Sequence, residues 1–477
     1  MLPILLISCY ELGHQPMGIA SPAGFLRRAG FEPEALDYAI EGINEEKIKR
    51  AKLIGISVPM HTALRLGTKL AERIREINPT SHVCFFGLYA SLNADYLLEH
   101  VADSIIGGEF EQQLVDLANA LDSGKDLRTV TGITTKSTSA RPQLVRLNFA
   151  APDRTVLPTI ENYARLEHKG NLGLVGYVEA SRGCLHHCTH CPIPPVYEGR
   201  FFVVPKDIVL NDIRQLIAAG AKHITFGDPD FLNGPKHSLS IAQALHNEFP
   251  DVTFDFTAKI EHILKYEETV REMGRNGCVF LVSALESVSD SVLNHLVKGH
   301  TAKDIVRALE ITREASITLR PSFVAFTPWT TLSDFVEMLR FIENQNLTDH
   351  VDPVQYTIRL LIPPGSLILR DNLHELWLGE LDQAAFSYRW THPDAQMDDL
   401  YFKLQSVVEE AVRTNSSIRN AFYQVCKTVE QVYGSKFTSP SRALPLATDR
   451  PPRLTESWFC CAEPTQQQMD ALTCCND

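Results

Sequence analysis

Apolar residues in the first part of the chain form short runs that alternate with helical patterns. Residues 2–8 and 53–58 are continuous apolar runs, as expected for parallel strands covered on both faces. Further strands are predicted at 83–87 and 104–107, and helices at 22–29, 61–77, 94–99 and 112–121. This alternation predicts a doubly wound α/β domain over residues 1–130, whose ligand would bind beyond the carboxyl ends of the strands.

A second alternation begins after residues 131–174, a stretch rich in Ser, Thr, Arg and Pro that we interpret as a linker. Six strands are predicted, at 177–180, 223–226, 253–257, 278–284, 318–325 and 354–361. Helical patterns lie between them, the first at 207–219. Residues 175–370 therefore predict a partial (β/α)6 barrel, with its chemistry at the carboxyl ends of the strands.

The pattern changes again after Pro363-Pro364-Gly365. Residues 371–455 predict a helical C-terminal region, with helices at 377–383 and 397–433. The last residues, 456–477, form a tail that carries four of the eleven cysteines of the chain. The predicted fold class is thus α/β, with a helical region and a cysteine-rich tail at the end.

Composition and charge narrow the class of protein. The formal net charge of −13 argues against a nucleic-acid partner, which needs a basic surface. The chain begins without the basic segment of a secretory signal, and no stretch reaches the roughly 18 apolar residues of a membrane span. We therefore expect a cytoplasmic protein without a membrane partner, whose cysteines serve metal or redox chemistry rather than disulfides.

Three cysteines lie close together after the first predicted barrel strand: Cys184, Cys188 and Cys191. Thiolates are the natural ligands of iron–sulfur clusters, and three on one loop leave one iron of a 4Fe–4S cluster open. The same loop carries three histidines: His186, His187 and His190. A zinc site, for which a histidine would supply the fourth ligand, and a chance grouping of cysteines are the alternatives. The position of the loop favours the cluster.

The C-x3-C-x2-C spacing resembles the radical S-adenosylmethionine (SAM) superfamily. The resemblance implies that the open iron chelates the amino and carboxylate groups of SAM, and that an electron from the cluster breaks a carbon–sulfur bond. The position before the last cysteine is often aromatic in that family and is His190 here. Strand-end motifs match in order and imply these SAM-binding residues: Asp228, Lys259, Glu286, Ser287, Arg320 and Arg359. A structural ion pair remains the alternative for each charged residue.

A doubly wound domain ahead of such a barrel resembles the cobalamin-binding class. The segment Ile106-Gly107-Gly108-Glu109-Phe110-Glu111 is similar to the end of the fourth strand in those domains. A D-x-H-x-x-G signature is absent, and Glu11-Leu12-Gly13-His14 is only a loose echo of it. We expect a retained scaffold with an empty or narrowed pocket more than a domain that binds cobalamin.

The tail carries two pairs of adjacent cysteines, Cys460-Cys461 and Cys474-Cys475, which are good soft ligands for thiophilic ions. Idle thiols and a second metal site are the alternatives. The sequence Cys460-Cys461-Ala462-Glu463-Pro464 resembles a radical SAM group with a Cys-Cys-Ala-Glu-Pro tail, which is associated with arsenic genes and arsinothricin biosynthesis. That resemblance implies transfer of the 3-amino-3-carboxypropyl group of SAM to trivalent arsenic held by the tail thiols.

The sequence thus predicts a 3-amino-3-carboxypropyl transferase that acts on arsenite and gives a hydroxyarsinothricin-type product. It would need an electron donor such as flavodoxin or ferredoxin. A cobalamin-dependent radical SAM methyltransferase acting on a small molecule is the alternative. A redox sensor that binds arsenic or zinc is a third, non-enzymatic hypothesis.

Overall fold

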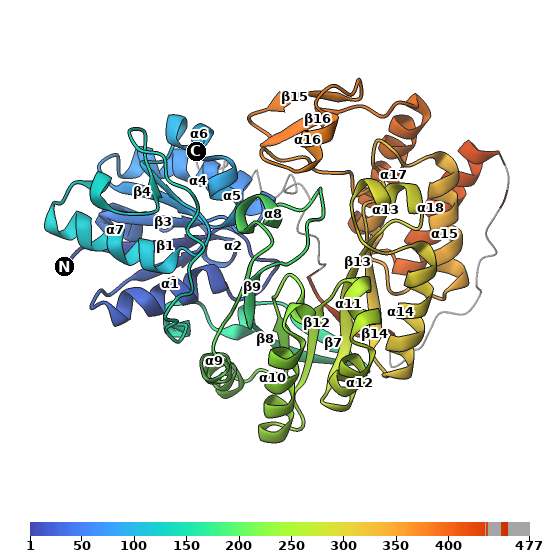
Figure 1. Ribbon diagram of the computed structural model, residues 1–477, viewed down its shortest axis with the longest axis horizontal. Helices are drawn as coiled ribbons and strands as arrows, with labels where there is room; N and C mark the ends of the chain where they lie inside the picture. Colours follow the sequence, from blue (N-terminus) through green and yellow to red (C-terminus); the bar gives the residue numbers. More distant parts are fainter. Residues whose placement is uncertain (435, 437–449, 457–477) are drawn as a thin grey trace.

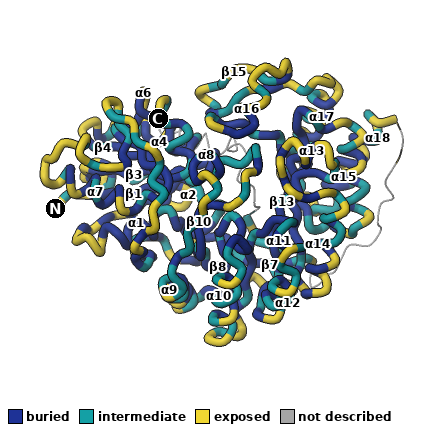
Figure 2. Tube along the Cα trace, in the orientation of Figure 1, coloured by how far each residue is buried: buried dark blue, intermediate teal, exposed yellow. Residues whose placement is uncertain are grey.

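The computed structural model describes residues 1–434, 436 and 450–456, and these form two α/β bodies. The N-terminal body and the barrel body lie side by side in Figure 1, each built on one sheet. Buried residues follow the strands of both sheets, as Figure 2 shows. Among the described residues, none of the helices has the length and apolar character that crossing a bilayer requires.

The N-terminal sheet has the strand order β2-β1-β3-β4-β5-β6, in which the last strand alone is antiparallel. Its strands are β1 (Ile4–Ser8), β2 (Glu34–Asp37), β3 (Leu53–Ser57), β4 (His82–Phe86), β5 (Ser104–Ile106) and β6 (Ile133–Thr134). The main covering helices are α1 (Met17–Arg28), α4 (His61–Ile77), α6 (Ala94–His100) and α7 (Glu111–Ser123). The predicted doubly wound domain is confirmed. Sequence patterns missed β2, a short edge strand with little apolar periodicity.

The barrel sheet has the order β14-β13-β12-β11-β8-β7-β17. Five parallel strands form its centre: β8 (Asn171–Val178), β11 (His223–Phe226), β12 (Thr253–Thr257), β13 (Cys278–Glu286) and β14 (Thr318–Phe323). Antiparallel β7 (Arg165–His168) and β17 (Arg453–Leu454) extend one edge. Helices α9 (Lys206–Ala218), α10 (Pro235–Glu248), α12 (Glu267–Arg275), α14 (Ala302–Glu314) and α15 (Leu332–Asn344) lie between the strands along the chain. The predicted α/β barrel fold is confirmed.

Three predicted elements are wrong in detail. Residues 354–361 form a 3-10 helix, η5 (Pro353–Thr357), and a single bridge from Arg359 to Phe326 in place of a sixth strand. Residues 377–383 belong to the hairpin of β15 (Leu378–Asp382) and β16 (Ser387–Trp390), not to a helix. The long predicted helix is divided into α17 (Ala395–Arg413) and α18 (Ile418–Tyr433). Asn415 adopts a left-handed conformation between them, and Ser417 caps the second.

The hairpin of β15 and β16 reaches back to the N-terminal body. Phe386, at the turn, is buried in the N-terminal core and meets the ring of Tyr96 edge-on at 4.9 Å. His61 Nε2 lies 2.8 Å from the carbonyl oxygen of Ala385. The C-terminal region therefore holds the N-terminal body and the barrel together.

Candidate active site

The cysteine loop follows β8 and begins at the short strand β9 (Ser181–Gly183), which pairs with β10 (Phe201–Val203). Gly183 has a φ of 75°, and a Cβ there would lie 2.4 Å from the carbonyl oxygen of Arg200, so only glycine fits. Cys184 and Cys188 are buried, and Cys191 is half-buried. The amide of Cys191 donates to the carbonyl of Cys188 at 3.2 Å, which keeps the turn tight.

All three cysteines line one cavity of about 270 Å³ at the carboxyl ends of the barrel strands. Burial raises the pKa of the Cys184 thiol, so a free thiolate is disfavoured at this position. A bound metal group that takes thiolate ligands would stabilise the deprotonated sulfur. Three thiols on one tight loop, facing a cavity, fit a 4Fe–4S cluster with one open iron. Each is also free of a disulfide, which leaves the sulfur available.

Glu286 is a charged residue of the same cavity. It ends β13 with a φ of 64° at an irregularity in the pairing with β14, a strained backbone of the kind found at functional sites. Lys298 Nζ and His190 Nε2 each lie 3.1 Å from its carboxylate. Burial alone would raise the pKa of Glu286, but Lys298 and His190 hold it well below its ordinary value. Glu286 is therefore a buried carboxylate beside the cluster loop.

Lys298 was not predicted as a site residue, yet it faces both the carboxylate and the cysteines. Burial would lower the pKa of Lys298, but the charges of Glu286, Cys188 and Cys191 raise it. Its side chain is 3% exposed. Its one sequence signal was a Lys-Gly-His segment between two predicted helices, which is too common to identify a site.

Asp228, Lys259 and Arg320, three of the residues expected to bind SAM, line the same cavity. Asp228 accepts hydrogen bonds from the hydroxyl of Ser181 and, at 3.0 Å, from the amide of Ala180. Burial raises the pKa of Asp228 to about 7 in spite of these bonds. Lys259 and Arg320 each have a carboxylate partner, at 3.4 Å and 3.2 Å. Lys259 and Arg320 thus remain paired while they line the cavity.

Two predicted SAM-binding residues are not among the residues that line the cavity. The guanidinium of Arg359 bonds Asp398 at 2.7 Å and stacks on the ring of Trp390 at 3.8 Å, so it anchors the C-terminal region. Ser287 is buried outside the cavity lining, and its hydroxyl accepts the amide of Ser289. For both residues the expected place in the site is corrected. The four tail cysteines lie outside the described residues.

The cavity continues toward the N-terminal body. A second cavity of about 770 Å³ lies at the carboxyl ends of β1 and β2, and His14 and Glu456 line both cavities. Burial lowers the pKa of His14 to about 3, so its imidazole is neutral, and the ring stacks on Tyr177 at 4.6 Å. Glu456 accepts a hydrogen bond from the hydroxyl of Tyr10 at 2.6 Å.

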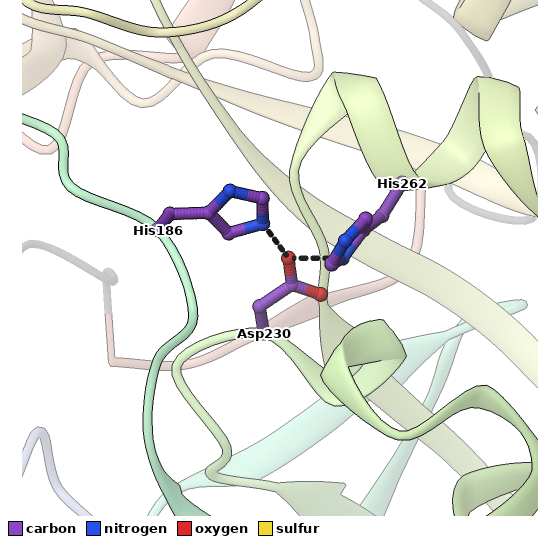
Figure 3. A group of neighbouring side chains, drawn as sticks. All are labelled: His186, Asp230 and His262. Carbon is purple, nitrogen blue, oxygen red and sulfur yellow. Dashed lines mark ion pairs between the residues drawn. The ribbon is translucent and has the colours of Figure 1, made fainter. Parts of the chain in front are cut away.

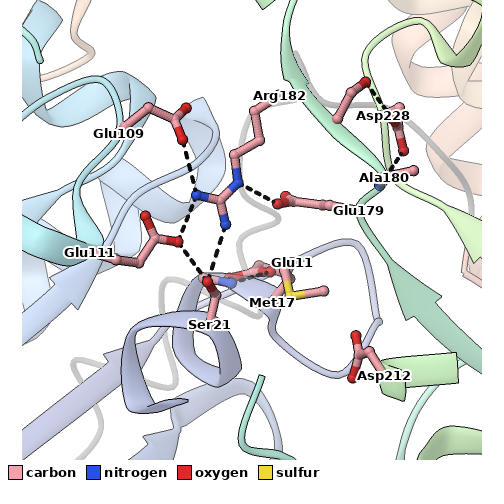
Figure 4. Close-up of polar contacts among 12 residues, drawn as sticks. Glu11, Met17, Ser21, Glu109, Glu111, Glu179, Ala180, Arg182, Asp212 and Asp228 are labelled. Carbon is pink, nitrogen blue, oxygen red and sulfur yellow. Dashed lines mark hydrogen bonds and ion pairs between the residues drawn. The ribbon is translucent and has the colours of Figure 1, made fainter. Parts of the chain in front are cut away.

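Arg182 joins the cluster loop to the N-terminal body (Figure 4). Its guanidinium lies 2.6 Å from Glu111, 2.8 Å from Glu179 and 3.5 Å from Glu109. Ser21 donates its hydroxyl to Glu111 at 2.6 Å. Glu109 and Glu111, from the segment that resembles the cobalamin-binding class, therefore neutralise the charge of buried Arg182, two residues before Cys184.

Comparison with known proteins agrees with this architecture. The B12 binding domain family matches residues 3–118, and the radical SAM superfamily matches residues 178–342. The chain is 21% identical to an uncharacterized methyltransferase of Pyrococcus horikoshii, with 73% of this chain and 76% of the relative covered. It is 22% identical to the hopanoid C-3 methylase of Methylococcus capsulatus, where 66% of this chain spans 62% of that enzyme.

A solved structure has the same fold. It is the cobalamin-dependent SAM radical enzyme OxsB with aqua-cobalamin and SAM bound, with a TM-score of 0.69 and 17% identity over 91% of this chain and 70% of that one. The B12-binding match favours cobalamin over the empty scaffold that we expected, and these matches give no support to transfer to arsenic. The chain therefore contains a B12-binding domain followed by a radical SAM domain and has the fold of cobalamin-dependent radical SAM enzymes.

Proposed function

We propose that this chain is a cobalamin-dependent radical SAM enzyme that transfers a methyl group to a small molecule. One observation carries the proposal: the cysteine-lined cavity and the cavity at the carboxyl edge of the B12-binding domain share His14 and Glu456. A group bound in one cavity would therefore face a group bound in the other. The methyltransferase relatives support the same class of reaction.

Cys184, Cys188 and Cys191 would hold the 4Fe–4S cluster. When bound and reduced, the cluster supplies the electron that cleaves SAM. Lys298 lies near Cys188 and Cys191 and offsets part of the negative charge that thiolates and cluster bring to a buried site. His190 Nε2 lies 3.1 Å from the carboxylate of Glu286, which fixes the orientation of its ring.

The charged residues of the cavity lining would bind the aminoacyl end of SAM. Glu286 and Asp228 are carboxylates suited to an ammonium group, and Arg320 and Lys259 are cations suited to a carboxylate. Apolar side chains such as Phe280, Val282 and Phe323 make up much of the remaining wall. Apolar surroundings exclude water, which strengthens each charge contact.

The carboxyl ends of β1 and β2 would hold cobalamin, which supplies a carrier for the methyl group when bound. The neutral imidazole of His14 offers a nitrogen lone pair there, and Ser8 has a buried hydroxyl without a hydrogen-bond partner in the described structure. A small-molecule acceptor is favoured over a nucleic acid, because the formal net charge of the chain is −13.

The test is anaerobic purification with cobalamin, followed by absorption spectroscopy and analysis of the nucleosides formed from SAM after reduction. We expect bound cobalamin and two nucleosides: S-adenosylhomocysteine, which remains when the methyl group leaves SAM, and 5′-deoxyadenosine, which remains after reductive cleavage of SAM. Cys188→Ser should abolish turnover, whereas Cys426→Ser, a buried cysteine of α18, should not. A chain that binds no cobalamin and yields no S-adenosylhomocysteine would contradict the proposal.

A second candidate function is transfer of the 3-amino-3-carboxypropyl group of SAM to arsenite. The tail sequence Cys460-Cys461-Ala462-Glu463-Pro464 favours this function, and so does the position of Glu456, where the described chain ends. Glu456 is the last described residue and lines both cavities, and Cys460 follows four residues later in the sequence. This reaction leaves methylthioadenosine, so the same nucleoside analysis, repeated with arsenite present, distinguishes the two functions.

A further inference from the structure

Two histidines and an aspartate converge beside the cluster loop (Figure 3). His186 comes from that loop, Asp230 from the segment after β11, and His262 from α11 (Ile260–Lys265). Oδ2 of Asp230 lies 3.4 Å from Nε2 of His186 and 2.8 Å from Nδ1 of His262. These three atoms all lie within 4.8 Å of one another.

Ordinary hydrogen bonding does not account for the three inward atoms. Each is buried and lies at ion-pair distance from another member of the set, but none has a partner that meets hydrogen-bond geometry within the described part of the chain. Burying polar atoms without partners is costly, and native structures rarely do so. Three such atoms aimed at one point indicate a bound group that satisfies all of them.

The outward atoms of two of these side chains lie near other groups. Oδ1 of Asp230 accepts the amide of Leu232 at 2.9 Å, and Glu261 Oε2 lies 3.6 Å from Nδ1 of His186. Metal-binding histidines commonly direct their second ring nitrogen to a carboxylate in this way. With the Nδ1 proton directed toward Glu261, the Nε2 lone pair of His186 faces Asp230 and His262. A purely structural His–Asp pair needs one ring nitrogen at the carboxylate, whereas here two approach the same oxygen.

We propose that His186, Asp230 and His262 bind a divalent transition-metal ion of the zinc class, separate from the iron–sulfur cluster. Two imidazoles and one carboxylate form a ligand set that such ions take, with a fourth position left for water. Glu261, whose side chain is 43% exposed, lies 3.6 Å from His186, so the site is close to solvent. The ion would tie the cluster loop to the segment after β11 and to α11, and so position that loop.

The test uses the full-length protein with its cluster reconstituted, incubated with Zn²⁺ and desalted before metal analysis. We expect one zinc per chain in addition to the iron of the cluster. His262→Ala and Asp230→Asn should lose this zinc and keep the absorbance of the cluster. His246→Ala, a half-buried histidine of α10 outside the set, should keep both.

The cysteine loop is the competing place for zinc, so a second measurement separates the two sites. A variant with Cys184, Cys188 and Cys191 all changed to Ser should still bind zinc, and with Co²⁺ should give visible absorption without thiolate-to-cobalt charge transfer. Zn²⁺ should also raise the melting temperature of the native chain but not of His262→Ala. Absence of zinc from the native chain would overturn the proposal. So would loss of zinc from the cysteine variant together with its retention by His262→Ala.

Discussion

At the residue scale, buried carboxylates at the edge of the N-terminal sheet make stability depend on pH. Asp37 ends β2 and is 2% exposed, and it accepts a hydrogen bond from the hydroxyl of Tyr163 at 2.8 Å. Burial raises the pKa of Asp37 from 3.8 to about 6, although the bond to Tyr163 lowers it. The folded state therefore holds this proton more tightly than the unfolded state does.

Asp37→Asn should for this reason be more stable than the native chain at neutral pH. Between pH 4 and 6 the folded state binds more protons, so the free energy of unfolding of the native chain falls as pH rises. Asn cannot ionise, so the variant should gain about 2–3 kcal/mol relative to the native chain across that interval. Urea unfolding at pH 4, 5, 6 and 7 measures the difference. Asp95→Asn, at an exposed position of α6, is the control. A difference in the free energy of unfolding between Asp37→Asn and the native chain that stays constant with pH would contradict the raised pKa of Asp37.

The site residues differ in how far sequence alone could identify them. Cys184, Cys188 and Cys191 were predictable because ligands on one tight loop keep a fixed local spacing. Lys298 and His262 were not predicted, because their roles depend on contacts between segments far apart in the chain. Arg359 was assigned by its place at the end of a predicted strand, and without that strand it packs against Trp390 instead.

At the element scale, Arg154 ties four segments together between the two bodies. It forms two bonds to Asp212 of α9, at 3.0 Å and 2.8 Å, and donates to the carbonyls of Tyr177 and Gln15. Arg154→Met should lower the free energy of unfolding by about 3–5 kcal/mol, because it leaves a buried carboxylate unpaired. The double variant Arg154→Met with Asp212→Leu should recover much of that loss.

Denaturant unfolding of the single and double variants tests this, with Arg413→Ala as the surface control. The pair of Arg413 and Glu410 is exposed, so its loss should change the free energy of unfolding by at most about 1 kcal/mol. Equal effects of Arg154→Met and Arg413→Ala would mean that the buried pair does not link the segments as described.

The hairpin of β15 and β16 explains why one element was predicted wrongly. The segment around Trp377 has mixed helix and strand tendencies, and tertiary contacts decide between them. Tyr388 donates its amide to the carbonyl of Ile362, and the indole of Trp390 donates to the carbonyl of Leu360. Ile362 and Leu360 lie in another segment of the chain, so the hydrophobic pattern of residues 377–390 carries no sign of these hydrogen bonds. The central parallel strands were predictable because their apolar runs are continuous.

Phe386→Ala should release this hairpin from the N-terminal body. Removing a buried phenylalanine costs about 3–5 kcal/mol, and here the loss falls on a contact between two bodies. We expect faster proteolysis at the turn near Ala385, with the α/β sheets still folded by circular dichroism. Phe402→Ala, which changes a 61% exposed residue of α17, is the control and should leave the proteolysis rate unchanged.

At the scale of the whole molecule, the last described residues contact segments from the first half of the chain. Strand β17 pairs with β7, and Thr455 donates its amide to the carbonyl of Arg165. The bond from Tyr10 then fixes Glu456 between the two cavities. These contacts bring the start of the cysteine tail to the point where a cluster, SAM and cobalamin would meet.

Truncation after Glu456 therefore separates the two proposed functions. The shortened chain keeps β17 and every described contact of the cavities, so cluster absorbance and SAM binding should match those of the full chain. If the tail thiols present arsenite, truncation and the combined change of Cys460 and Cys461 to Ser should both abolish the organoarsenical product, while uncoupled cleavage of SAM continues. If the reaction is methyl transfer to another acceptor, both variants should retain S-adenosylhomocysteine formation at near the native rate. Truncation that instead removes the cluster itself would contradict the assignment of its ligands to the loop after β9.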